Sequence, residues 1–156
     1  MADAPTQPAD YALINAVYLA ALSGLAALAA RPGRDEGVPL QELPVMGLAA
    51  FALADLVTKQ KVATWMREPF VEESADHRPL RPAGEGLRYA LGELLTCSRC
   101  MGAWSALGLV GLRVAAPGPG RSVSTVLATA GANHFLQAGF SLLCASPSTA
   151  QTRERT

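Results

Sequence analysis

The stretch that decides the fold is YALINAVYLAALSGLAALAA, residues 11–30, which has no charged side chain in twenty positions. A helix rises about 1.5 Å per residue, so this run crosses the roughly 30 Å hydrocarbon core of a bilayer. The ten residues before it carry two aspartates and no Lys or Arg, unlike a cleavable signal peptide, although Ala27-Leu28-Ala29 imitates a cleavage site. The pattern predicts a membrane-spanning helix after a disordered tail, residues 1–10.

The composition agrees with a helical protein surrounded by lipid. Half of the 156 residues are apolar but only 6% are aromatic, and small residues such as Ala let helices approach closely inside a bilayer. The formal net charge is zero, so no overall field attracts nucleic acid, and we expect no nucleic-acid partner. Eleven of the thirteen basic residues are Arg, which together with abundant Ala, Gly and Pro indicates a GC-rich bacterial source.

Three more apolar segments follow, at residues 43–60, 89–116 and 123–145. A polar stretch, 61–88, separates the first two, the turn 117–120 (Pro-Gly-Pro-Gly) separates the last two, and 146–156 forms a polar tail that we expect to be disordered. We therefore predict an all-α bundle of four transmembrane helices. The alternative has three, because the segment 43–60 is short and contains Asp55.

The distribution of Lys and Arg predicts the orientation. In the four-span arrangement, residues 58–88 and the C-terminal tail lie on one side and hold eight basic residues, against three or four on the other. The positive-inside rule then places both termini and the 61–88 loop in the cytoplasm of a bacterial cell, with the bundle in the inner membrane. Taken alone, the first span favours an external N-terminus, since acids precede it and Arg31 and Arg34 follow it. That arrangement suits the three-span alternative, in which the 61–88 loop is still cytoplasmic.

The candidate chemistry lies in GELLTCSRCMGAW, residues 92–104. On one continuous helix, Glu93, Cys97, Cys100 and Trp104 form a single stripe. Arg99 and the start of the helix favour a reactive thiolate, while a charged Glu93 opposes it. Three interpretations stay open: a redox dithiol, two cysteines that pack as small hydrophobes, and a metal site. A metal would need further ligands, from His77, His134 or Cys144, and no cofactor is favoured.

Polar residues inside the predicted spans are a second set of candidates, because burying them in lipid is costly. They are Asp55, Asn133, His134 and Gln137. Interhelical hydrogen bonding explains them without a function. A proton or ion path through Asp55, Glu93 and His134 is the functional alternative.

The segment after the second span offers a candidate surface for docking a membrane or cytoplasmic protein partner. It contains Trp65, Arg67, Pro69 and Phe70. The proline ends the helix, and the aromatic residues equally suit an anchor at the membrane interface.

Two motifs resemble those of DUF1360, a family of small bacterial integral membrane proteins of unknown function. The segment KVATWMREPF, residues 61–70, resembles its basic segment ending in R-x-P-F, and residues 92–104 resemble its E-L-L-T-C-x-x-C-x-G-x-W signature. The resemblance covers roughly residues 45–143, although Ser98 and Arg99 replace the apolar residues usual between the cysteines. It implies a multi-pass helical membrane protein and no established activity.

No complete catalytic constellation is visible, so we expect a non-enzymatic binding or scaffold protein of the membrane. The alternatives are a membrane thiol-disulfide redox protein or thiol sensor that uses Cys97 and Cys100, and a proton or ion carrier.

Overall fold

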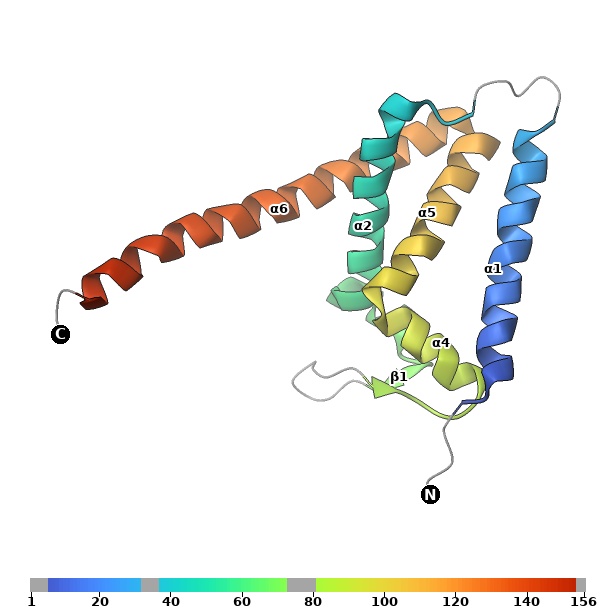
Figure 1. Cartoon of the computed structure of the whole chain (residues 1–156), viewed down its shortest axis with the longest axis horizontal. Coiled ribbons are helices and arrows are strands. Elements are labelled where there is room, and N and C mark those ends of the chain that lie inside the picture. Colours follow the sequence, from blue (N-terminus) through green and yellow to red (C-terminus); the bar gives the residue numbers. More distant parts are fainter. Residues whose placement is uncertain (1–5, 32–36, 73–80, 154–156) are drawn as a thin grey trace.

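The computed structural model describes residues 6–31, 37–72 and 81–153, with side chains up to residue 145. This part of the chain is almost entirely helical, which confirms the all-α class (Figure 1). The elements in chain order are α1 (Pro8–Ala29), η1 (Leu40–Glu42), α2 (Leu43–Lys59), η2 (Lys61–Ala63), α3 (Thr64–Arg67), β1 (Val71–Glu72), β2 (Arg81–Pro82), α4 (Leu87–Thr96), α5 (Ser98–Ala115) and α6 (Pro117–Arg153).

Four long helices alternate in direction (Figure 1). α2 packs against both α5 and α6, whereas α1 contacts α5 and α4. The C-terminal part of α6 leaves the bundle. Within the described residues, α1 and the segment Leu40–Lys59 are long and apolar enough to cross a membrane, and α1 buries none of its residues. The four-span arrangement needs α5 and α6 as well, and these two helices do not meet the same criterion.

Small residues bring α2, α5 and α6 together. The core cluster contains Met46, Ala49, Ala50, Leu109 and Ala128, of which Ala49 is completely buried. On α6, a Cβ atom added at Gly131 would lie 2.9 Å from the Leu48 carbonyl oxygen of α2. The two backbones therefore meet at a distance that only a residue without a side chain allows.

The third apolar segment, which we expected as one span over 89–116, consists of two helices that meet at an angle (Figure 1). The Thr96 hydroxyl donates to the Gly92 carbonyl at 3.0 Å, inside the last turn of α4. Cys97 then adopts an extended conformation (φ −91°, ψ 102°), and its sulfur accepts a hydrogen bond from the Cys100 N–H as the N-cap of α5. A side chain that caps the start of one helix competes with continuation of the helix before it. Here the Cys97 cap ends α4 and starts α5.

Other boundaries also differ from expectation. The Pro-Gly-Pro-Gly run at 117–120 is the first turn of α6 rather than a loop, because proline suits the first turn of a helix. Position 120 requires glycine, because a Cβ atom there would lie only 2.5 Å from the Cα atom of Arg113. The helix continues to Arg153, past the expected end at residue 145. At the other terminus α1 starts at Pro8, where the Asp10 carboxylate accepts from the Gln7 N–H at 2.9 Å.

The expected cytoplasmic loop, 61–88, contains short regular elements where it is described. β1 and β2 form a two-residue antiparallel pair, in register Val71 with Pro82 and Glu72 with Arg81. Residues 73–80, which include the candidate ligand His77, lie outside the described residues.

Candidate functional site

A cleft with a volume of about 760 Å³ lies between α1, α4 and α5. Its lining residues come from the N-terminal half of α1, from α4 and from the start of α5, which meet at the end of the bundle near β1 (Figure 1). We call it the thiol cleft. The lining comprises the signature residues Glu93, Cys97, Cys100 and Trp104, several apolar neighbours, and Tyr11, Asn15 and Tyr18 from α1. The residues expected on one helical stripe therefore do share one site, although a bend, not a continuous helix, brings them together.

The two cysteines of the C-x-x-C pair face each other. Their sulfur atoms are 2.7 Å apart, and both cysteines are free. A disulfide needs about 2.05 Å between sulfurs, so only a small movement separates this dithiol from its oxidised form. The Cys100 thiol donates to the Cys97 sulfur, and the Cys100 backbone N–H adds a second hydrogen bond to it. Both bonds stabilise a thiolate at Cys97, which makes it the candidate nucleophile of the pair.

Helix α1 supplies the opposite wall of the thiol cleft. The Tyr11 hydroxyl donates to the Glu93 carboxylate, and the ring of Tyr18 meets Trp104 edge to face, with centroids 5.2 Å apart. Sequence analysis missed both tyrosines because 82 residues separate Tyr11 from Glu93. One available signal was their spacing of seven residues, which places two amphipathic rings on one face of an otherwise aliphatic helix.

The predicted intramembrane polar residues divide into two groups. Asp55 binds Lys59 at 2.6 Å and lies 3.9 Å from His134, so these two candidates meet between α2 and α6. Asn133 and Gln137, on the same helix as His134, are exposed. Asp55 lines a second cleft of about 380 Å³, while Glu93 lines the thiol cleft. A proton or ion path through Asp55 and Glu93 would therefore have to connect two separate clefts.

No metal centre is apparent in the described ranges, since no three His, Cys, Asp or Glu side chains gather there in a way that could hold an ion. Cys144, a candidate extra ligand, is exposed on α6.

The candidate docking segment is largely a structural corner. Arg67 is only 2% exposed and donates to the carbonyls of Val57 at 2.6 Å and Gln60 at 3.2 Å, at the C-terminal end of α2. The carbonyl of Pro69 accepts from Arg88 at 2.8 Å, and that of Phe70 accepts from the Ala83 N–H. These bonds explain the R-x-P-F pattern as a corner that joins α2 to β2 and α4. Trp65 differs, with 72% of its surface exposed.

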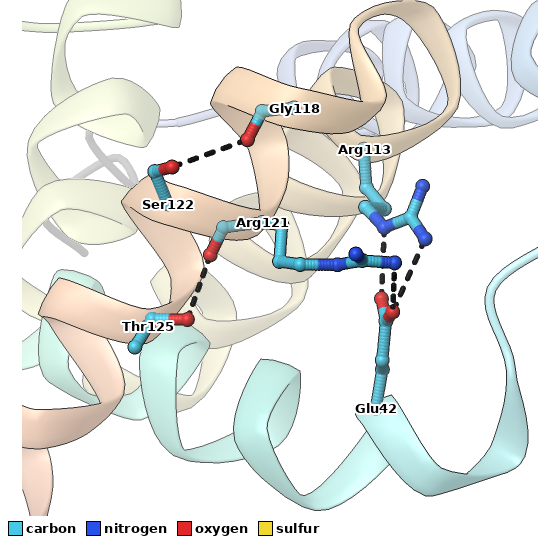
Figure 2. A network of polar contacts seen from close by, with 6 residues as sticks. All are labelled: Glu42, Arg113, Gly118, Arg121, Ser122 and Thr125. Atoms are coloured by element: carbon cyan, nitrogen blue, oxygen red, sulfur yellow. Dashed lines mark hydrogen bonds and ion pairs between the residues drawn. The ribbon is translucent and has the colours of Figure 1, made fainter.

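A charged cluster that sequence analysis did not predict lies at the opposite end of the bundle. The Glu42 carboxylate accepts from Arg113 at 2.8 and 3.1 Å and from Arg121 at 3.0 Å (Figure 2). The three residues come from η1, α5 and α6, so one carboxylate joins the ends of three elements. The Arg113 side chain is 5% exposed and that of Arg121 is 66% exposed.

These features define a class: an all-helical protein with two helices apolar enough to cross a membrane and a dithiol in a cleft beside one of them. The chain belongs to the family described as "Protein of unknown function (DUF1360)", whose model matches residues 45–140. The match starts after α1 and includes both motif segments. No curated protein and no solved structure matches the chain.

Proposed function

We propose that this protein is a four-span protein of the bacterial inner membrane, with both termini and the thiol cleft toward the cytoplasm. The support is the alternating direction of α1, α2, α5 and α6 and the unburied apolar surface of α1. Lys59, Lys61, Arg81 and Arg88 lie at the thiol-cleft end, whereas Arg113 and Arg121 at the other end are both paired with Glu42. An excess of accessible basic residues at the thiol-cleft end favours that end as the cytoplasmic one.

We further infer that the Cys97–Cys100 pair cycles between dithiol and disulfide, so that the protein is a membrane thiol-disulfide redox protein. The observation that carries this proposal is the geometry of the pair: two free sulfurs 2.7 Å apart, with Cys97 as the N-cap of α5. The positive end of a helix dipole and a donated thiol proton both stabilise a thiolate at Cys97. This geometry favours redox chemistry over the scaffold function expected from the sequence.

The exchange reaction assigns a different role to each cysteine. The Cys97 thiolate attacks one sulfur of a disulfide substrate, forms a mixed disulfide, and releases the other sulfur as a thiolate. The Cys100 thiol then gives its proton to that leaving thiolate. Its sulfur attacks the sulfur of Cys97, which forms the Cys97–Cys100 disulfide and releases the second substrate sulfur. The substrate gains two electrons and the protein loses two.

Intact-protein mass measurements with glutathione disulfide test these roles. We expect the parent protein to form an internal disulfide, and Cys100→Ser to accumulate a stable glutathione adduct because it lacks the resolving thiol. Cys97→Ser should react much more slowly. All of these proteins carry Cys144→Ser, because Cys144 is exposed, lies outside the cleft lining and would itself take up glutathione; the matched control is Cys144→Ser with both cleft cysteines intact. An adduct that forms equally on both single variants would contradict the assignment.

Partner binding stays as a second candidate because the Trp65 side chain is 72% exposed beside the buried corner. A photo-crosslinking amino acid at position 65, irradiated in native membranes, tests it. A specific protein adduct supports a docking role for Trp65. Crosslinks to lipid alone would show that this residue is an interfacial anchor.

A further inference from the structure

The thiol cleft has the volume and the lining of a small-molecule site. Its volume of about 760 Å³ lies within the roughly 300–1,000 Å³ of small-molecule pockets, and a few polar groups stand among apolar and aromatic walls. The edge-to-face pair of Tyr18 and Trp104 forms one wall. Such a wall offers a flat ring an aromatic face to stack on.

The polar groups of the cleft lie where α1 meets α4. Tyr11 donates to Glu93, so a hydroxyl and a carboxylate meet at one place in the lining. The amide of Asn15 lines the same space. The Asn15 amide supplies a hydrogen-bond donor for a carbonyl oxygen, and the Tyr11 hydroxyl becomes a second donor if the ligand displaces Glu93 as its acceptor.

The wall made by α1 gives an apolar ligand a way in. This helix has no buried residue, and Leu13 and Val17 are each 52% exposed. In the proposed arrangement this surface meets lipid, so a molecule dissolved in the bilayer reaches the cleft sideways, past α1.

We propose that the thiol cleft binds a lipid-soluble quinone, which oxidises the Cys97–Cys100 dithiol. This inference rests on the proposed redox function and names its electron acceptor. The Cys97 thiolate adds to a ring carbon, which forms an S–C bond. The sulfur of Cys100 then attacks that of Cys97, an S–S bond forms, and the S–C electron pair returns to the ring. The proton that Cys97 released when it ionised, returned through water, and the proton of Cys100 end on the two quinone oxygens, so one quinone becomes one quinol for each disulfide.

A stoichiometric reaction in detergent tests the chemistry. The protein is fully reduced, freed of reductant and mixed with a decyl-substituted benzoquinone, and quinol is read from absorbance while alkylation followed by mass measurement counts free thiols. We expect one quinol for each Cys97–Cys100 disulfide, and none beyond background with Cys97→Ser. If glutathione disulfide oxidises the pair but the quinone does not, the quinone site is overturned and the redox function stands. If neither oxidant forms the disulfide, both proposals fail.

A second experiment tests the location without depending on the reaction. In a Trp65→Phe, Cys97→Ser background, Trp104 is the sole tryptophan, and bound quinone should quench its fluorescence to saturation. Ala103→Phe places a ring in the cleft and should weaken quinone binding by about tenfold or more, because the ligand loses the space it fills. The matched control is Ala21→Phe on the exposed surface of α1, outside the lining, which should bind like the parent. Equal, non-saturating quenching in all three would overturn the site.

Discussion

At the residue scale, the clearest result is that Arg67 is a structural residue. Its guanidinium is buried and holds two carbonyl oxygens at the end of α2. A guanidinium offers several donors in one plane, which a single ammonium does not reproduce. Burial and internal hydrogen bonds therefore account for the arginine of the R-x-P-F segment without a partner protein.

We expect Arg67→Ala to destabilise the protein by about 3 kcal/mol, because buried carbonyl groups lose charge-assisted hydrogen bonds. Arg67→Lys should recover only part of this loss. Unfolding in detergent, titrated with SDS, measures the effect, and Lys61→Ala at an exposed neighbouring site is the control. An unchanged midpoint for Arg67→Ala would contradict the capping role.

Gly92 is required for a close approach rather than for a special backbone angle. A Cβ atom there would lie 2.4 Å from the Phe70 carbonyl oxygen and 3.0 Å from Cβ of Pro82. We expect Gly92→Ala to cost about 1–3 kcal/mol through overpacking. Gly102→Ala has no atom within 4 Å of its new methyl and should be neutral or stabilising by up to about 1 kcal/mol. The same SDS titration compares the two, and equal effects would contradict the close contact.

The thiol pair predicts a pH dependence. The Cys97 sulfur accepts hydrogen bonds from the Cys100 thiol and the Cys100 backbone N–H, which stabilise its thiolate. Cys100→Ala removes the thiol donor and should move the alkylation profile of Cys97 to higher pH. Iodoacetamide rates against pH, measured in a Cys144→Ser background, check this. A profile that does not move would show that the Cys100 thiol has no influence.

At the element scale, the break at Cys97 determines the site. Without it, α4 would continue along α5 instead of turning under the bundle toward α1 (Figure 1). The turn places α4, α5 and α1 around one cleft. Thr58 on α2 is tied to this point, since its hydroxyl lies 3.1 Å from that of Ser98.

The Glu42 cluster predicts that its two arginines contribute unequally to the stability of the protein. Arg113→Ala removes the buried partner and should lower the unfolding midpoint clearly, whereas Arg121→Ala removes an exposed one and should change it little. SDS titration of both variants measures the difference. A larger loss with Arg121→Ala would reverse the assignment of the central pair.

At the scale of the whole molecule, the proposed topology places the exposed side chains of Gln41 and Trp65 on opposite sides of the membrane. In a variant whose three cysteines are replaced by Ser, Gln41→Cys should react with a membrane-impermeant maleimide from outside the cell membrane. Trp65→Cys should react only after permeabilisation, because α2 lies between the two positions. Labelling of both from one side would mean that α2 does not cross, as in the three-span alternative.

Local patterns in this chain predict a large part of the fold. Uncharged runs and their spacing predict the all-α class and the existence of long helices, because helix formation and apolar burial depend on residues near in sequence. The family followed from two short motifs, and the match over residues 45–140 confirms it. The break at Cys97 was not foreseen, since a continuous apolar pattern does not report that a cysteine side chain caps a helix.

The sequence by itself determined the all-α class, the family and the identity of the two cysteines, since each of these depends on residues that are neighbours in the chain. Only the tertiary structure decided that Tyr11 meets Glu93, that Glu42 joins Arg113 and Arg121, and that Arg67 is buried. The first two contacts bring together residues more than seventy positions apart. Such contacts depend on how whole helices pack, and no local pattern encodes their geometry.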